Sequence, residues 1–120
     1  MTPEEILNGN KLIAKFMGLK IITDEISWFD TNYKSLGNYD SSWDWLMPVI
    51  DKIETLNYAV TITQNICTIK ACIMGDRTTI SHQTGNYTTP DTKLYNTYIA
   101  VIEFINWYNK QIKENESSIN

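Results

Sequence analysis

Histidine, arginine and cysteine are scarce in this sequence, and their scarcity excludes several kinds of site. The 120 residues contain one histidine, His82, one arginine, Arg77, and two cysteines, Cys67 and Cys72. A zinc site takes about four Cys, His or carboxylate ligands. One histidine and two cysteines five positions apart do not match a usual zinc pattern. We therefore expect two reduced thiols, no bound metal and no cofactor.

Recognisable catalytic motifs are also absent. Ser81 directly precedes His82, but no GxSxG turn surrounds the serine, and adjacent side chains of a strand point to opposite faces. Asp44 and Asp51 share a helix face but lie two turns apart, too far to share a proton. No HExxH, P-loop or GxGxxG pattern occurs. We therefore expect a protein that is not an enzyme and that acts by binding.

Positive charge is in short supply. Ten basic residues, nine of them lysines, stand against fourteen acidic ones and give a net charge of −4. A nucleic-acid-binding domain usually carries a basic stripe. Only Arg77 offers the planar group that contacts phosphate or guanine through two hydrogen bonds. The sequence predicts no DNA or RNA binding, and ordinary solubility explains the charge.

Long apolar runs are missing as well. No stretch approaches the roughly 18 residues that a membrane span needs, and Glu4 and Glu5 do not fit the basic start of an export signal. Hydrophobic residues make up 42% of the chain and charged residues 20%, as in folded globular proteins. We expect one soluble, intracellular domain over residues 1–113, a polar tail over 114–120 and no membrane partner.

Three segments have helical periodicity. Residues 2–5 (TPEE) fit a capping box and begin a helix that runs to about residue 17. A second helix is expected over about 43–56, where Pro48 indicates either a kink or a later start near residue 44. The third helix is expected from the Thr-Pro pair at 89–90 to about residue 113.

The segments between these helices favour strands. Residues 19–33 predict a hairpin, or one longer bent strand, because the expected turn lacks glycine. Strands are also expected over 58–63 and 66–74, followed by a long polar loop over 75–89 with room for a short strand at 78–81. The face of 66–74 that carries Met74 is apolar enough for a helix or a second subunit to cover it. The order α-β-β-α-β-β-(β)-α predicts an α+β fold in which three helices pack a small antiparallel sheet.

Aromatic residues make up 12% of the chain, and several lie in or beside expected loops, where a ring stacks on a base or inserts into a partner. Trp43 lies on the apolar stripe of the second helix and is expected in the core, whereas Trp45 projects away from it. The segment 75–79 joins the only arginine to two hydroxyls, a combination that holds a phosphate, although capping explains hydroxyls at helix starts equally well. The candidate ligand-binding residues are Arg77, Thr78, Thr79, His82, Tyr87 and Trp45.

Three stretches carry a resemblance to known sequences. They are IAKFMGLK at 13–20, YDSSWDWLMPVIDKIE at 39–54 and AVIEFINWYN at 100–109. In this order they resemble small uncharacterised phage and prophage proteins of Bacteroidetes and, more remotely, the phage α-β-α sandwich domain. That family carries no assigned activity.

The resemblance implies an accessory protein in the cytoplasm of an infected bacterium. By analogy of origin and size, the leading hypothesis is counter-defence: the protein sequesters a nucleotide-type immune signal, such as a cyclic nucleotide or a cyclic ADP-ribose, as a homo-oligomer. One alternative is an inhibitor that occludes a host defence enzyme. Another is a virion or replication accessory protein without a small ligand.

Overall fold

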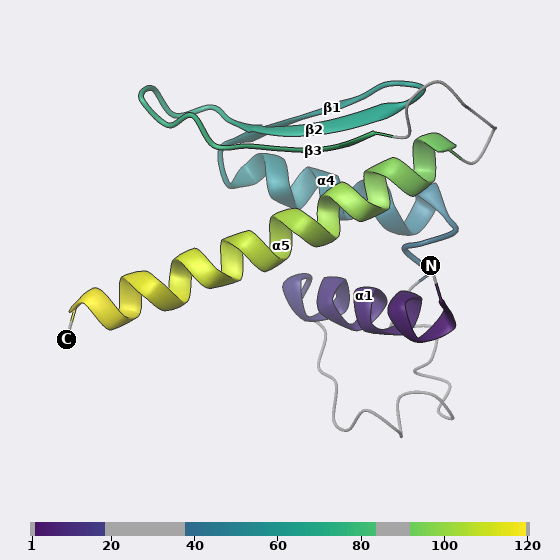
Figure 1. Cartoon of the computed structure of the whole chain (residues 1–120), viewed down its shortest axis with the longest axis horizontal. Helices are drawn as coiled ribbons and strands as arrows, with labels where there is room; N and C mark the ends of the chain where they lie inside the picture. The colour runs from purple at the N-terminus through teal and green to yellow at the C-terminus, as the bar shows by residue number, and fades with distance from the viewer. Residues whose placement is uncertain (1, 19–37, 84–91, 120) are drawn as a thin grey trace.

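The computed structural model describes residues 2–18, 38–83 and 92–119, which form helices and one antiparallel sheet (Figure 1). This confirms the α+β class. The hairpin expected over 19–33 and the helix cap expected at 89–90 lie outside the described residues. In chain order the elements are α1 (Pro3–Phe16), α4 (Trp43–Thr55), β1 (Tyr58–Ile62), β2 (Ile66–Ala71), β3 (Thr79–Gln83) and α5 (Thr92–Ile119).

The start of α1 is the capping box that the sequence predicts. The Glu5 N–H donates to the Thr2 hydroxyl at 3.1 Å, and the Thr2 N–H donates to the Glu5 carboxylate at 3.2 Å. At the other end, the Lys52 ammonium of α4 donates to the carbonyl of Phe16 and lies 4.7 Å from the centre of its ring. A cation there complements the negative end of the helix dipole, so α4 helps to hold the end of α1.

Pro48 lies inside α4. The helix begins at Trp43, and not at the later start near residue 44 that the proline offered as one alternative. Proline has no N–H, so the carbonyl of Asp44 lacks its usual helical donor four residues later. Leu46, Val49, Ile50 and Ile53 are buried along one side of the helix. Their burial against the sheet and α5 stabilises the helix despite the proline.

The sheet is a meander in the order β1-β2-β3. The alternation expected for β1 is confirmed, and the short strand expected near 78–81 is β3. The strand expected over 66–74 is shorter, because β2 ends at Ala71 and the chain then reverses. Gly75 adopts a φ of +89°, a conformation open to glycine but strained for other residues, and the Thr78 N–H donates to the Asp76 carboxylate at 2.9 Å. These two features end the strand before Met74.

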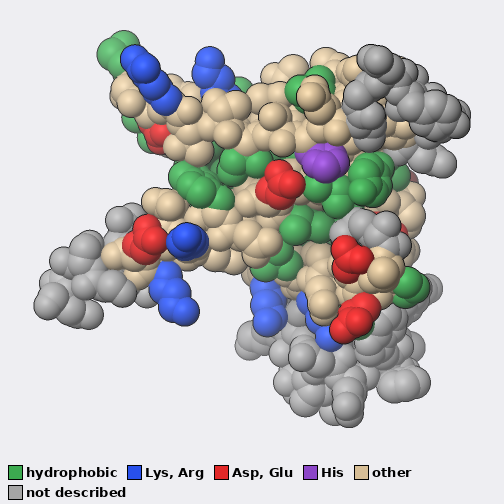
Figure 2. Space-filling view, viewed as in Figure 1, with side chains coloured by type: hydrophobic (Ala, Val, Ile, Leu, Met, Phe, Trp, Pro, Cys, Tyr) green, Lys and Arg blue, Asp and Glu red, His purple; other side chains and the backbone are tan. Residues whose placement is uncertain are grey.

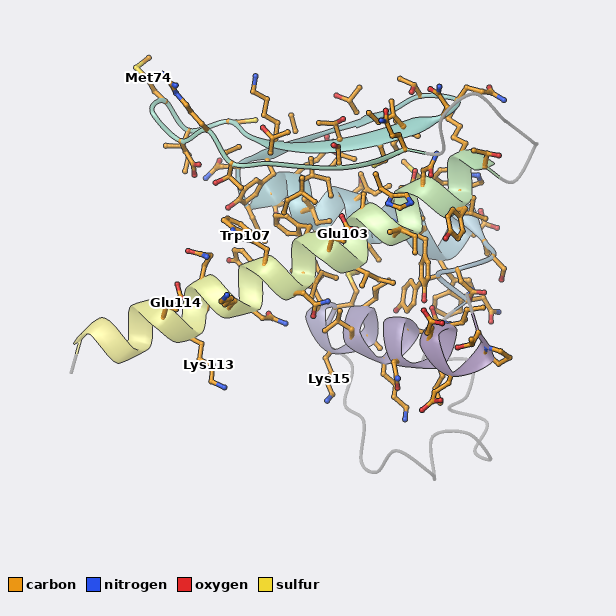
Figure 3. The ribbon with its side chains drawn as sticks, viewed as in Figure 1. Lys15, Met74, Glu103, Trp107, Lys113 and Glu114 are labelled. Atoms are coloured by element: carbon orange, nitrogen blue, oxygen red, sulfur yellow. The ribbon has the colours of Figure 1, made fainter. Side chains whose placement is uncertain are left out.

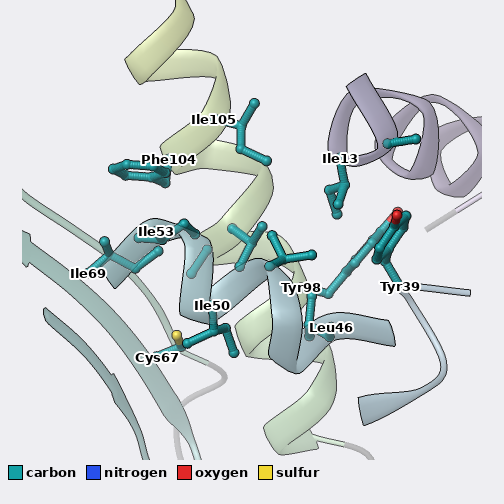
Figure 4. Close-up of a cluster of buried hydrophobic side chains, with 14 residues drawn as sticks. Ile13, Tyr39, Leu46, Ile50, Ile53, Cys67, Ile69, Tyr98, Phe104 and Ile105 are labelled. Atoms are coloured by element: carbon teal, nitrogen blue, oxygen red, sulfur yellow. The ribbon is translucent and has the colours of Figure 1, made fainter. Parts of the chain in front are cut away.

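The elements form three layers: the sheet, then α4 and α5, then α1 (Figure 1). Figure 4 shows the buried side chains that join the layers, from Ile69 and Cys67 on β2, through Ile53 of α4 and Phe104 of α5, to Ile13 of α1. The other face of the sheet carries mostly exposed Thr, Ser and Lys side chains. The molecule is flat, with extents of 47 × 46 × 22 Å.

A close contact explains the glycine inside α1. Tyr98 of α5 is buried, and its hydroxyl lies 3.1 Å from both the Ile6 carbonyl and the Asn10 side-chain oxygen. A Cβ on Gly9 would lie 2.3 Å from this hydroxyl, which is far inside van der Waals contact. Glycine therefore lets α1 approach α5. Beyond this contact α5 continues to Ile119, six residues past the predicted end, because residues 114–119 contain no helix-breaking Gly or Pro.

Candidate functional site

Three of the predicted ligand-binding residues lie together at one end of the sheet. Arg77 and Thr78 belong to the loop between β2 and β3, and Thr79 begins β3. Arg77 is exposed, and its carbonyl accepts a hydrogen bond from the Thr79 hydroxyl at 3.4 Å. The hydrogen bonds from Thr78 hold the pKa of the Asp76 carboxyl below its usual value. The loop thus keeps a carboxylate beside the arginine.

The same hairpin end exposes apolar side chains. Met74 is 99% exposed and Ile73 is 56% exposed, and Figure 3 shows Met74 at the far tip of the hairpin. Both residues lie in the turn beyond β2, so among the described residues neither a helix nor another strand covers them. The apolar end of this segment therefore lies at a tip that no described helix covers.

His82 does not join this group. Three positions separate it from Thr79, so the two side chains point to opposite faces of β3, and His82 faces α5. Its ring nitrogen lies 3.8 Å from the Glu103 carboxylate, and its ring centre lies 5.9 Å from that of Tyr95. Figure 2 shows the histidine beside a carboxylate and among apolar side chains on the broad face of the molecule.

Trp45 lies farther away. The Cys72 N–H donates to the Asn57 carbonyl at 2.9 Å, which places the β2–β3 loop near the C-terminal end of α4. Trp45 lies in the first turn of α4, ten residues before its end, or about 15 Å along the axis. The structure therefore keeps Trp45 apart from Arg77. Tyr87, the sixth predicted residue, lies outside the described part of the chain.

Trp45 has a hollow of its own, which we call the Trp45 hollow. It has a volume of about 390 Å³ and is lined by Met17, Tyr39, Asp44, Trp45 and Pro48. The Tyr39 and Trp45 rings meet edge to face, with their centres 5.8 Å apart. Apart from the exposed Asp44, the lining is apolar or aromatic, so this hollow has an acidic rim.

A second hollow lies on another side of α4, and we call it the Trp43 hollow. It has a volume of about 340 Å³ and is lined by Trp43, Met47, Ile62 and Lys93. These residues come from α4, the end of β1 and the first turn of α5. The exposed Lys93 therefore lines the same hollow as an indole ring and two apolar side chains.

The sequence prediction missed the Trp43 hollow. The sequence predicts Trp43 in the core, and the ring does pack against core residues, but it is only partly buried. The available signal was the four-residue spacing of Trp43 and Met47, which places both side chains on one side of a helix. No sequence signal links them to Lys93, which is fifty positions from Trp43.

The described residues form no cluster of metal ligands, and their cysteines are unpaired. Within residues 2–18, 38–83 and 92–119, no three His, Cys, Asp or Glu side chains gather as a metal site would require. Both cysteines are free, and burial raises the pKa of the Cys67 thiol to about 11, against a smaller opposing effect of its hydrogen bond with Thr97. A thiol with this pKa stays protonated and unreactive at neutral pH.

Comparison with known proteins yields no relative. No protein-family model, no curated protein and no solved structure matches this chain. The resemblance to phage proteins therefore stays a prediction. None of the helices in the described ranges has the length and apolar character of a membrane span.

Proposed function

We propose that the protein binds and sequesters a nucleotide-type anion without transforming it, and that the Trp43 hollow holds one nucleotide unit. The observation that carries this proposal is that Lys93, which is exposed, and Trp43 line the same hollow. Among the described hollows and loops, this one combines a stacking surface with a cation.

Each wall has a part in binding. A base that stacks on an aromatic ring gains about 1–3 kcal/mol, and the partly buried Trp43 ring lines the hollow. Met47, which is 42% exposed, and Ile62 supply apolar contact beside it. The Lys93 ammonium is a point charge that suits a phosphate. The Trp45 hollow also contains an indole ring, but the carboxylate of Asp44 in its lining repels a phosphate.

The size of the hollow limits the ligand. Pockets for small molecules usually hold about 300–1,000 Å³, so about 340 Å³ accommodates one base with its sugar and phosphate. A cyclic dinucleotide or trinucleotide would place one unit in each hollow and leave the others for further copies of the protein. This agrees with the predicted homo-oligomer that sequesters an immune signal in an infected cell.

Thermal shifts against cyclic dinucleotides, cyclic trinucleotides and cyclic ADP-ribose isomers test the proposal. A bound ligand at one hundred times its Kd stabilises the folded protein by roughly 2.7 kcal/mol, and stacking should quench Trp43 fluorescence. Lys93→Ala should remove the shift while Lys93→Arg keeps it. Trp45→Phe is the matched control and should keep both the shift and the quenching. A flat response to every ligand would refute the proposal.

Arg77→Ala separates the two candidate anion sites. The sequence prediction places the phosphate at Arg77, Thr78 and Thr79, which lie at the Tyr58 end of the sheet, whereas Lys93 lies near the Ile62 end. If the ligand occupies the Trp43 hollow, Arg77→Ala should leave its affinity unchanged. Loss of the shift in Arg77→Ala but not in Lys93→Ala would move the site to the hairpin loop.

A protein partner is the second candidate ligand, and the exposed hairpin tip favours it. Ile73 and Met74 are strongly exposed, and apolar side chains that insert into a partner often dominate an interface. An inhibitor that occludes a host enzyme should capture one stoichiometric partner from host lysate. Met74→Asp should abolish this capture, whereas Lys93→Ala should not. Capture that survives Met74→Asp would exclude the tip as the inhibitory surface.

A further inference from the structure

The outer edge of β3 has backbone groups that point away from the sheet. The Ala71 N–H donates to the Thr78 carbonyl at 2.9 Å, which fixes the phase of the ladder between β2 and β3. In an antiparallel pair, alternate residues direct both backbone groups to the same neighbour. Ile80 and His82 therefore bond to β2, and Thr79, Ser81 and Gln83 direct their N–H and C=O groups outward.

Nothing in the described part of the chain pairs with this edge. β3 also lacks the features that usually protect an edge strand, since it contains no proline and no lysine or other formally charged residue. The opposite edge is formed by β1, whose last residue, Ile62, lines the Trp43 hollow. A strand added there would lie beside that hollow.

We propose that β3 pairs with β3 of a second copy of this chain, antiparallel and about a two-fold axis at Ser81. The outward groups at positions 79, 81 and 83 are symmetric about Ser81, so the edge is complementary to itself. Ser81 then pairs with Ser81 of the partner subunit, and Thr79 pairs with Gln83 of the partner subunit. The two sheets become one six-stranded sheet.

The side chains on both faces suit this pairing. On the open face, hydroxyl and amide groups meet across the axis, and Thr or Ser pairs of this kind stabilise neighbouring strands. On the helix side, Ile80 of one copy lies opposite His82 of the other, beside the partly exposed Tyr95. β3 contains no lysine or arginine, so the pairing brings no like charges of the two strands together.

The position of α5 also permits it. α5 contacts both β2 and β3 and so lies beneath the space between them. Strands are about 4.8 Å apart, so a second copy beyond β3 would place the two α5 axes about 10 Å apart. Packed helices have axes about 8–10 Å apart. The two α5 helices would therefore touch without overlapping.

His82 of β3 lies on the broad face of the molecule, which is only 22 Å thick (Figure 2). A standard interface buries about 800 Å² of each partner, so residues around β3 must contribute as well as the strand itself. Figure 2 shows that the region around His82 on this face carries several apolar side chains. Dimerisation through β3 would cover that apolar region.

Disulfide trapping tests the two-fold axis, in a Cys72→Ser background that removes the exposed native thiol. Residues paired by two backbone hydrogen bonds have Cα atoms about 5.5 Å apart, which a disulfide spans. Ser81→Cys should form a covalent dimer under mild oxidation. Thr61→Cys is the matched control, because it is exposed on the same face two strands away, and it should stay monomeric on a denaturing gel.

The register has its own test. Thr79→Cys and Gln83→Cys should each fail to crosslink alone. In the proposed pairing, position 79 of one copy lies opposite position 83 of the other, so two copies of the same variant have their cysteines four residues apart. When Thr79→Cys and Gln83→Cys are mixed and only one of them carries an affinity tag, the tag should recover a disulfide-linked dimer of the two variants. A parallel or shifted pairing would crosslink one variant with itself, and that result would overturn the proposal.

The native protein must also show the dimer. Sedimentation of the wild type should give twice the 13.9 kDa of one chain. Ser81→Pro removes only an outward N–H, which edge strands tolerate, so it should sediment as a folded monomer. A wild type that stays monomeric at every concentration overturns the proposal, as does equal trapping of Ser81→Cys and Thr61→Cys.

Discussion

Two tryptophans that are two positions apart in α4 line hollows of opposite electrostatic character. The lining of the Trp43 hollow includes Lys93, whereas the lining of the Trp45 hollow includes Asp44. The rings offer the same stacking surface. On the proposed function, the neighbouring charge, and not the aromatic ring, decides which hollow accepts an anion.

The two hollows also differ in what supports them. The Trp45 hollow includes Met17, which caps α1, and Tyr39, which is 2% exposed. Next to Tyr39, the Asp40 carboxylate accepts a hydrogen bond from Asn10 of α1 at 3.0 Å. The described lining of the Trp43 hollow comes from α4, β1 and α5 alone. Docking of α1 should therefore matter to one hollow and not to the other.

The largest expected effect is a loss of stability from a change in α4, the helix that both hollows share. Leu46 is fully buried and lies in the part of α4 that carries both tryptophans. Leu46→Ala should lower the free energy of unfolding by about 2–5 kcal/mol, because it removes apolar contacts and leaves a cavity. Urea denaturation measures this loss. An effect under 1 kcal/mol would show that α4 is not anchored through Leu46.

Gly9→Ala should separate the two hollows. The added Cβ would lie 2.3 Å from the Tyr98 hydroxyl and 2.7 Å from a methyl carbon of Ile102. Overpacking of this kind usually costs about 1–3 kcal/mol, more than the roughly 1 kcal/mol that alanine gains in a helix. Trp45 fluorescence, isolated by replacing Trp28, Trp43 and Trp107 with Phe, should change. Trp43 fluorescence, isolated by replacing Trp28, Trp45 and Trp107 with Phe, should not, and equal changes would contradict the separate support of the hollows.

Exchanging the two charges should exchange the preference for anions. Lys93→Glu should weaken binding of adenosine monophosphate at Trp43 by about tenfold or more, because a hydrogen bond to a charged group is worth about 1.5–3 kcal/mol. Asp44→Lys should allow the same nucleotide to quench Trp45. Titrations in single-tryptophan backgrounds measure both effects. If Asp44→Lys leaves Trp45 unquenched, shape rather than charge distinguishes the hollows.

The smallest expected effect concerns Tyr98, which joins α1 to α5 beside the Trp45 hollow. Burial, helped by the charge of Asp40, raises the pKa of the Tyr98 phenol well above its usual value. The folded protein therefore favours the neutral phenol, and this contribution to stability is complete below about pH 10 and is lost as the pH rises further. Tyr98→Phe should cost about 1 kcal/mol at neutral pH.

Melting temperatures from pH 7 to 11 measure this contribution. The decline above about pH 10 should be shallower in Tyr98→Phe than in the wild type, because the substituted ring cannot ionise. Identical declines would show that other groups control alkaline unfolding.

The sequence predicts local features of this fold better than features that join distant segments. The capping box at residues 2–5 and the alternation in β1 depend on neighbouring residues, and both are confirmed. The end of β2 was missed because residues 72–74 have the same apolar character as the strand, and the turn at Gly75 ends it. The reason for Gly9 becomes visible only when Tyr98 is in place.

In the candidate site, too, the sequence predicts which neighbouring residues lie together better than which distant residues meet. Arg77, Thr78 and Thr79 are adjacent in sequence and stay together in the structure, whereas Trp45 and His82 are placed elsewhere by α4 and by the pleat of β3. The Trp43 hollow needs three elements to meet, with residues at positions 43, 62 and 93. No local pattern can predict that meeting.

The contact between α1 and α5 has a consequence for the order of folding. Its hydrogen bond from Tyr98 to Ile6 joins residues 92 positions apart, whereas the β1–β2 hairpin pairs Ile62 with Cys67. Short-range pairings form with little loss of chain entropy, and distant ones come later. We expect α1 to dock last and to detach first, so its amide hydrogens should exchange at a lower opening free energy than those of β2. The Trp45 hollow would then be a transient feature that opens each time α1 detaches, while the sheet stays folded.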